Sequence, residues 1–326
     1  MAKPVVVFLD RHAPEVQAVI REEAPDAVEL RMVSSGDPSE RYALAREAAF
    51  FVGGIEPIPA DLIDAAPQLR LIHKWGVGVD KIDLGAARRR GIPVAITAGA
   101  NAVAVAEFTV LLMLAALRQL PRRVDQLRAG QWDVARAEAR RQSLQLRGRT
   151  VGIVGMGAIG REVARRLRAF EARLTYFDVR RLPRADEEAL GLVYAELDDL
   201  LRAADIVTLH LPLLPSTRNL LSRERIGRLK PNAIVVNTAR GGLVDEEALR
   251  EALEAGRILG AGVDVFGEEP PPPDHPLRAT GAPGLVATPH LAGSVFDNVA
   301  NVARHIFDNV LRVLNGHPLP PQDLVR

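Results

Sequence analysis

Short apolar runs alternate with amphipathic stretches over the first hundred residues of the chain. The runs are rich in valine, leucine, isoleucine and phenylalanine and are bounded by proline, glycine or aspartate, which is typical of β-strands. They are VVVFL (5–9), AVELRMV (27–33), AFFVG (49–53), LRLIHKW (69–75) and IPVAI (92–96). Between them, PEVQAVIREE (14–23) and IDLGAARRRG (82–91) place apolar residues at helical spacing. This alternation predicts an α/β unit with a parallel sheet that is covered on both faces.

The alternation starts again at Thr150, after a long apolar stretch (about 101–120) that predicts a buried helix and an arginine-rich segment that ends at Arg149. The further strand candidates are TVGIVG (150–155), RLTYFD (173–178), DIVTLHLP (205–212), AIVVNTA (233–239), ILGAGVDVF (258–266) and GLVATPH (284–290). A last helix is predicted over 294–315, where valine and isoleucine recur three or four residues apart. Two α/β units also agree with a length of 326 residues, because single cores rarely grow so large.

Composition and charge narrow the classes of partner. The chain is 48% hydrophobic and 25% charged with a formal net charge of +1, as in ordinary globular proteins. This balance gives no electrostatic reason to expect binding to nucleic acid or to an anionic membrane. The apolar segment Phe108–Leu117 is shorter than the roughly 20 residues that span a bilayer. The N-terminus lacks the pattern of a signal peptide.

The absence of cysteine excludes disulfides, thiolate metal sites and cysteine nucleophiles. It is compatible with the reducing cytoplasm, where we expect the protein to act. No two of the seven histidines have the spacing of metal ligands, so no metal site is predicted. His12, His305 and His317 are expected in surface segments.

A glycine-rich turn joins the strand at 150–155 to an amphipathic helix. Gly155, Gly157 and Gly160 form a GxGxxG pattern between these two elements, which is the context that a dinucleotide site requires. The three glycines would allow the tight turn, the close approach of a pyrophosphate and the packing of helix on strand. The start of the helix would offer unpaired N–H groups to the phosphates.

Asp178 ends the next strand, where an acid would bind the ribose hydroxyls of the adenosine. Its charge would repel a 2′-phosphate and so favours NAD over NADP, although Arg180 and Arg181 lie close enough to weaken that argument. An ordinary turn with a surface aspartate is the alternative interpretation.

Two further strands end in residues suited to chemistry. Arg240 follows a strand in a glycine-rich turn, at the edge of the sheet where α/β proteins bind ligands, and its guanidinium fork suits a carboxylate. A surface arginine is the alternative. His290 follows the strand at 284–290, and on position alone His210 is its rival.

Seven distinctive segments follow one another in the chain. They are KWGVGVDKIDL (74–84), AVAEFTVLLML (104–114), GIVGMGAIG (152–160), HLPLLPSTRNLLS (210–222), NTARGGLVDEEAL (237–249), GVDVFGEEP (262–270) and ATPHLAG (287–293). In this order the chain resembles the D-isomer-specific 2-hydroxyacid dehydrogenase family over nearly its whole length. This family includes D-3-phosphoglycerate dehydrogenases and glyoxylate or hydroxypyruvate reductases.

The resemblance implies catalytic roles for Arg240, Glu269 and His290. Glu269 rather than Glu268 matches the family, because it stands directly before Pro270. Its carboxylate would orient the His290 ring and stabilise the protonated form. His290 would then exchange a proton with the C2 oxygen of a 2-hydroxy acid during hydride transfer, while Arg240 holds the carboxylate.

The resemblance also implies contacts with cofactor and substrate. NAD would contact Gly155, Gly157, Ala158, Ile159, Gly160, Asp178, His210, Pro212, Thr217, Thr238, Ala239, Arg240, Asp264, His290 and Gly293. The substrate would contact Lys74, Trp75, Val77, Gly78, Asn101 and Arg240. The alternatives are a strand-end surface lysine at position 74 and a packing role for Trp75.

The same family resemblance implies a Rossmann NAD-binding domain at 101–290. It implies a flavodoxin-like substrate-binding domain formed by 1–100 and 291–326. The apolar helix and arginine-rich arm at 101–149 would make a homodimer, although burial within one subunit explains the helix equally well. The alternative function is an NAD(H)-sensing binding protein of the co-repressor type on the same fold.

Overall fold

The chain divides into two compact units. The computed structural model describes residues 3–325; unit 1 comprises Met1–Asn101 with Val295–Arg326, and unit 2 comprises Ala102–Ser294. The boundaries predicted from the sequence followed residues 100 and 290. Every pairing between named strands is parallel in both units, which confirms the predicted α/β class.

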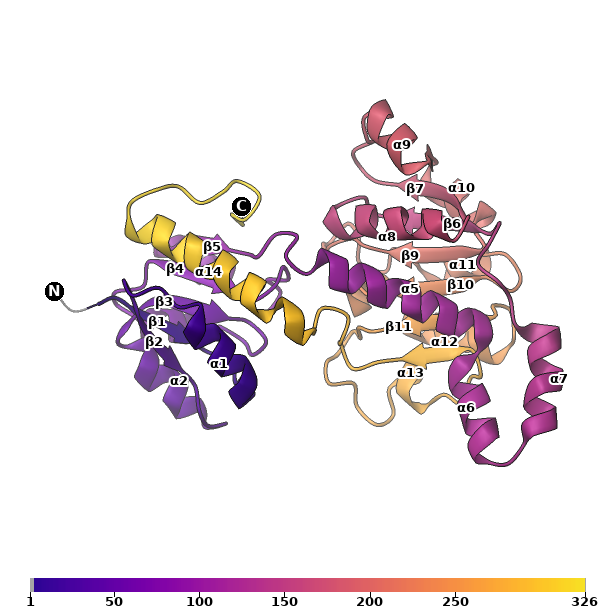
Figure 1. Ribbon diagram of the computed structural model, residues 1–326, viewed down its shortest axis with the longest axis horizontal. Coiled ribbons are helices and arrows are strands. Elements are labelled where there is room, and N and C mark those ends of the chain that lie inside the picture. The colour runs from indigo at the N-terminus through magenta and orange to yellow at the C-terminus, as the bar shows by residue number, and fades with distance from the viewer. Residues whose placement is uncertain (1–2, 326) are drawn as a thin grey trace. The chain divides into compact units, whose positions relative to one another are not determined.

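Unit 1 is built on a five-stranded sheet in the order β2-β1-β3-β4-β5. The strands are β1 (Val5–Phe8), β2 (Glu29–Met32), β3 (Ala48–Gly53), β4 (Leu71–Lys74) and β5 (Val94–Ala95). The helices are α1 (Pro14–Glu22), α2 (Pro38–Ala45), α3 (Ala60–Asp64), α4 (Leu84–Arg89) and α14 (Val299–Leu314), with a 3-10 turn η2 (Phe296–Asn298). α1 and α14 cover one face of the sheet and α2, α3 and α4 the other (Figure 1).

The C-terminal segment completes unit 1. Val302, Ile306 and Val310 of α14 are buried against the sheet, as the helical spacing predicts. Beyond the helix, the Ile96 N–H donates to the Asp323 carbonyl at 2.9 Å and the Val325 N–H to the Val94 carbonyl at 2.9 Å. The last described residues therefore cover the β5 edge of the sheet.

Unit 2 contains a seven-stranded sheet in the order β12-β11-β10-β9-β6-β7-β8. The strands are β6 (Thr150–Val154), β7 (Arg173–Phe177), β8 (Leu192–Tyr194), β9 (Ile206–Leu209), β10 (Ile234–Asn237), β11 (Gly260–Val263) and β12 (Leu285–Ala287). The helices are α5 (Ala102–Arg118), α6 (Leu120–Arg128), α7 (Trp132–Gln142), α8 (Ala158–Ala169), α9 (Arg184–Leu190), α10 (Leu197–Ala203), α11 (Arg223–Gly227), α12 (Glu246–Glu254) and α13 (Pro276–Ala279), with a 3-10 turn η1 (Gly241–Leu243).

Two apolar clusters form the core of unit 2, one on each face of the sheet. α5 and α8 pack on one face, and α10, α11 and α12 pack on the other (Figure 1). α6 and α7 form a helical hairpin that extends α5 and contributes little to either cluster (Figure 1). The sequence did not predict these two helices or the short edge strand β8, whose Val193 is largely exposed.

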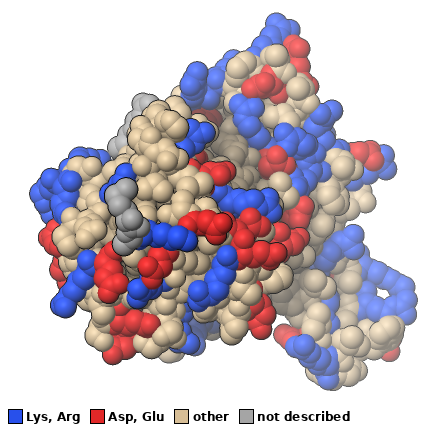
Figure 2. Space-filling model, turned by 60° about the vertical axis from the view of Figure 1, so that its left-hand side comes forward, with Lys and Arg blue, Asp and Glu red and all other residues tan. Residues whose placement is uncertain are grey.

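Acidic and basic side chains are interspersed over the face shown in Figure 2, in keeping with the formal net charge of +1. Within residues 3–325, no single helix has both the length and the apolar character needed to cross a membrane. Only α5 and α6 together reach that length and composition, and a bend of 59° separates them.

Candidate active site

The glycine-rich loop of unit 2 leaves no room for side chains at two positions. Gly155 has a φ of +99°, and an added Cβ would lie 2.6 Å from the His210 carbonyl oxygen. A Cβ on Gly160 would lie 2.1 Å from the Gly155 carbonyl oxygen. Gly157 is the N-cap of α8, and a Cβ there would meet no atom within 4 Å. The backbone at the start of α8, from Gly157 to Ile159, therefore offers an open cradle that fits a pyrophosphate.

Asp178 is fixed against this loop. Its two carboxylate oxygens accept hydrogen bonds from the Met156 N–H at 2.7 Å and from the Arg180 N–H at 3.0 Å. Of the two arginines that weakened the preference for NAD, Arg181 is already engaged. It pairs with Glu187 at 2.8 Å and stacks over the Tyr194 ring at 5.2 Å. Arg180 is thus the one basic side chain of this pair left to meet a 2′-phosphate.

A half-buried, uncharged imidazole follows the end of β9. Desolvation lowers the pKa of His210 to about 3, so the ring is neutral at physiological pH. Its Nε2 shares a hydrogen bond of 3.0 Å with the Thr208 hydroxyl, whereas its buried Nδ1 has no hydrogen-bond partner among residues 3–325. Next to it, Thr217 closes a turn by donating to the Pro212 carbonyl at 2.7 Å. An unpaired buried nitrogen at this edge fits a site that is completed by a ligand.

β10 ends in a turn that holds Arg240. The Asn237 side chain donates to the Arg240 carbonyl at 2.8 Å and accepts from the Ala239 N–H at 3.1 Å. Thr238 shares a buried hydrogen bond of 2.8 Å with Thr109 of α5, which fastens the turn to that helix. A Cβ on Gly241 would lie 1.9 Å from the Phe266 carbonyl carbon, so only glycine fits after the arginine. The half-buried Arg240 is thereby held at the carboxyl edge of the sheet.

Glu269 and His290 meet within unit 2. His290 Nδ1 lies 2.9 Å from Glu269 Oε2, and the other carboxylate oxygen accepts from the Phe266 N–H at 3.1 Å. Nδ1 therefore faces a carboxylate, which leaves Nε2 of the ring for a substrate. Glu268 is exposed whereas Glu269 is half-buried, so the structure separates the two adjacent acids.

The proline-rich loop that carries Glu269 is tied to α12. Glu246 accepts a hydrogen bond from the Gly267 N–H at 2.9 Å and contacts His275 Nε2 at 3.1 Å. His275 is buried and caps α13 through the Leu277 N–H. No local pattern in the sequence indicates this role for Glu246, because its partners lie more than twenty residues further along the chain.

Asp264 organises the backbone around His290. It is fully buried and accepts hydrogen bonds from the Thr288 hydroxyl at 2.6 Å and from the N–H groups of Leu291 and Ala292, both at 2.8 Å. His290 itself has a φ of +54°, a conformation that costs about 1–3 kcal/mol for a residue other than glycine. Asp264 and the preceding strand hold this strained position. The sequence analysis assigned Asp264 to the cofactor and missed this second role.

The predicted residues fall into two groups. The first group belongs to unit 2 and comprises the glycines of the loop, Asp178, His210, Pro212, Thr217, Thr238, Ala239, Arg240, Asp264, Glu269, His290 and Gly293. Lys74, Trp75, Val77, Gly78 and Asn101 belong to unit 1, at or beyond the end of β4. The Asn101 side-chain oxygen is buried and has no hydrogen-bond partner among the described residues. Within residues 3–325, no cluster of His, Asp or Glu could hold a metal ion.

Comparisons with known proteins agree with this arrangement. Residues 110–292 match the family described as "D-isomer specific 2-hydroxyacid dehydrogenase, NAD binding domain". The glyoxylate reductase of Thermofilum pendens is 38% identical over 98% of this chain and 94% of its own. The D-3-phosphoglycerate dehydrogenase of Methanocaldococcus jannaschii is 39% identical over 79% of this chain, and the match spans only 48% of that longer protein.

The structure of the NAD-dependent formate dehydrogenase from Staphylococcus aureus in complex with NAD has a TM-score of 0.83 with this chain. It is 26% identical and covers 99% of both chains. Together these matches confirm the predicted Rossmann-type architecture, NAD as the cofactor and an oxidoreductase activity. The chain belongs to the D-isomer-specific 2-hydroxyacid dehydrogenase family.

Proposed function

We propose that the protein interconverts a D-2-hydroxy acid and its 2-keto acid, with His290 as the acid/base. The observation that carries this proposal is the 2.9 Å contact between His290 Nδ1 and Glu269, on a strained backbone that Asp264 holds. A histidine paired in this way alternates between proton donor and proton acceptor. NAD supplies or accepts the hydride when it is bound.

Each member of the triad has a separate task. In the reducing direction His290 donates the proton from Nε2 to the C2 oxygen, and in the oxidising direction it takes that proton back. Glu269 orients the ring through Nδ1 and stabilises its charged form. Arg240 binds the substrate carboxylate with its guanidinium fork and polarises the C2 oxygen.

Cofactor and substrate contacts complete the proposal. The open backbone at Gly157, the fixed carboxylate of Asp178 and the unpaired nitrogen of His210 support NAD binding along the carboxyl edge of β6, β7 and β9. For the substrate we propose Lys74, Trp75, Asn101 and the backbone N–H groups of Val77 and Gly78. Unit 1 would then be the substrate-binding domain, and unit 2 the cofactor domain.

The proposal is tested by a substrate panel. NADH oxidation is followed with glyoxylate, hydroxypyruvate, pyruvate and longer 2-keto acids, in parallel with NADPH. We expect turnover with at least one acid and a higher kcat/KM with NADH. Tight NADH binding without turnover of any acid would contradict the proposal and favour the NAD(H)-sensing alternative.

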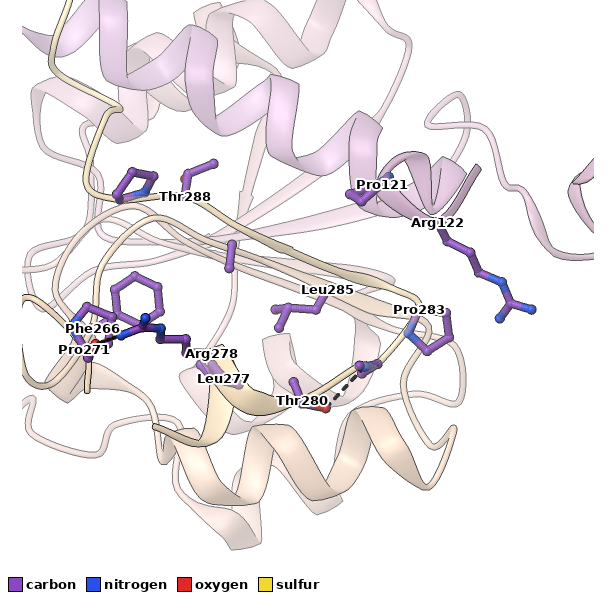
Figure 3. A pocket seen from close by; sticks show the side chains of 14 residues that line it. Pro121, Arg122, Phe266, Pro271, Leu277, Arg278, Thr280, Pro283, Leu285 and Thr288 are labelled. Carbon is purple, nitrogen blue, oxygen red and sulfur yellow. Dashed lines mark hydrogen bonds between the residues drawn. The ribbon is translucent and has the colours of Figure 1, made fainter. Parts of the chain in front are cut away.

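We further propose a homodimer formed through α5, α6 and α7. The hairpin exposes apolar side chains that a monomer would leave in water, namely Leu120, Val124, Leu127, Trp132 and Val134, of which Leu127 and Trp132 are each 58% exposed. An apolar cavity of about 620 Å³ lies beside the start of α6, between Pro121 and the edge of β12, with Phe266 and Leu285 in its walls (Figure 3). A second copy would cover this surface.

Sedimentation of the wild type and of Leu127→Glu tests the dimer. We expect the variant to shift toward monomer, because a carboxylate would be buried at the interface. The exposed Val193→Glu on β8 is the matched control and should keep the wild-type mass. A monomeric wild type would contradict the proposal.

A cytoplasmic location is part of the same proposal, because the cysteine-free chain suits a reducing compartment.

A further inference from the structure

Three aromatic rings lie together at the carboxyl edge of the sheet in unit 1. Phe8 ends β1, His12 follows it in the loop before α1, and Trp75 follows β4. The ring centroids of His12 and Trp75 lie 5.3 Å apart, those of Phe8 and Trp75 5.9 Å, and those of Phe8 and His12 6.0 Å. Phe8 is fully buried, whereas His12 and Trp75 are only partly buried. We call these three residues the aromatic wall.

The aromatic wall is uncharged at physiological pH. Burial lowers the pKa of His12, against the weaker opposing effect of the Asp10 carboxylate, so its imidazole is neutral. The sequence analysis assigned His12 to a surface segment, because nothing local to the residue indicates its partner more than sixty positions away. The wall therefore offers two ring surfaces but no cation.

One carboxylate and two lysines lie near the aromatic wall, and each has contacts within unit 1. Asp10 is buried next to the wall, and its two oxygens accept hydrogen bonds from the N–H groups of Ile55 at 3.0 Å and Glu56 at 2.9 Å. Lys81 donates to the Ile55 carbonyl at 2.9 Å. Lys74 is only 9% exposed, and its aliphatic chain runs so close to Gly54 that a Cβ there would lie 2.8 Å from Cδ.

We infer that the aromatic wall receives the side chain of the substrate, and that the preferred substrates are 2-keto monocarboxylates with a branched or aromatic side chain. The inference rests on the proposed function. Carboxyl ends of parallel strands are where α/β proteins bind ligands, and both half-buried rings lie at such ends. A phenyl or branched alkyl group would pack on Trp75 and His12, as aromatic side chains do in protein cores. The three rings offer no cation to a phosphate or second carboxylate, and the buried Asp10 carboxylate lies beside them.

The test compares kcat/KM of the wild type for five acids with NADH. Phenylpyruvate and 4-methyl-2-oxopentanoate carry apolar side chains, 3-phosphohydroxypyruvate and oxaloacetate carry a second anion, and glyoxylate has no side chain. We expect the apolar acids to exceed the dianionic ones by about 100-fold or more, the scale of specificity that pocket contacts give. A preference for either dianionic acid would overturn the inference while leaving the proposed function intact. Failure to reduce any of the five acids would overturn the inference, and failure with hydroxypyruvate and pyruvate as well would refute the proposed function.

Variants then assign the preference to the wall. In Trp75→Ala we expect the ratio of kcat/KM for phenylpyruvate to that for glyoxylate to fall by about 10- to 100-fold. Trp75→Phe, which keeps an aromatic ring and the fold, should restore most of the ratio. Phe170→Ala, an aromatic truncation at the 38% exposed end of α8, is the control and should keep the wild-type ratio. An unchanged ratio in folded Trp75→Ala would overturn the assignment.

Discussion

The two parallel sheets of this chain use their carboxyl edges in different ways. At the edge of unit 2, charged and polar side chains are fixed by hydrogen bonds: Glu269 to His290, Asp264 to the backbone that follows β12, and Asp178 to the glycine loop. The aromatic wall lies at the edge of unit 1. The Asp10 carboxylate beside it is buried and accepts hydrogen bonds from backbone N–H groups. Under the proposed function, one edge would carry the chemistry and the other would select the side chain of the substrate.

The largest effect is expected at His290. In His290→Gln we expect kcat to fall by about a thousandfold, because the amide cannot exchange the proton, while NADH affinity stays near wild type. Steady-state kinetics and NADH fluorescence titration measure the two quantities. A variant that retains wild-type kcat would remove the chemistry from the edge of unit 2.

The adjacent acids Glu269 and Glu268 provide a matched pair of variants. We expect Glu269→Gln to lower kcat by about 10- to 100-fold, since the neutral amide no longer stabilises the charged imidazole. Glu268→Gln should leave the rate unchanged, because Glu268 is exposed. Equal losses in the two variants would argue against the pairing.

The next prediction concerns stability and His73, a fully buried histidine of β4 in unit 1. Desolvation lowers its pKa from 6.5 to about 4, and its Nε2 lies 3.0 Å from Asn309. The folded state thus keeps the ring neutral, whereas the unfolded chain binds a proton below pH 6.5. Stability is therefore present above that pH and is lost as the pH falls toward 4, by about 2 kcal/mol at pH 5.

His73→Gln should remove this part of the pH dependence. Urea unfolding at pH 7 and pH 5 can be followed through Trp75 in a Trp132→Phe background, which leaves one tryptophan, in unit 1. His317→Gln changes an exposed histidine of the same unit and should retain the wild-type dependence. If both variants lose stability with pH as the wild type does, the neutral His73 is not the cause.

The smallest effect is expected at Asp178. Asp178→Ala should lower the ratio of kcat/KM with NADH to that with NADPH by about tenfold, as repulsion of the 2′-phosphate is removed and Arg180 remains. The loop also loses the hydrogen bond to Met156. Val179→Ala, at a side chain that is 92% exposed, controls for the change in the turn. An unchanged cofactor ratio would show that Asp178 does not discriminate.

The features that could be predicted from the sequence are those that depend on residues close together in the chain. The strand, glycine loop and helix at 150–170 are recognisable because the GxGxxG pattern and the helical spacing that follows it lie within one short segment. β8 was missed because it is only three residues long, and α6 and α7 were missed because their sequences are rich in arginine and other polar residues. The chemical roles of Glu269 and His290 came from family resemblance, since no local pattern indicates that a proline-rich loop reaches a strand end.

Long-range contacts explain the remaining failures. The aromatic wall brings His12 and Trp75 together, and a second network joins His305 to Asp323 at 2.8 Å and Asp323 to Asn309 at 3.0 Å. Each of these histidines looked like a surface residue because its partner comes from another element. In physical terms, burial is decided by the tertiary fold and not by the flanking residues.

The assembly of unit 1 from both ends of the chain has a consequence for biosynthesis. Val6, Phe8 and Phe50 pack against α14, and the ribosome makes all of unit 2 before that helix emerges. At about 5–20 residues per second, the N-terminal strands wait on the order of ten seconds or more with one apolar face in water. Unit 1 can therefore complete its core only after unit 2 has been synthesised, and until then its first hundred residues expose an apolar face of their sheet.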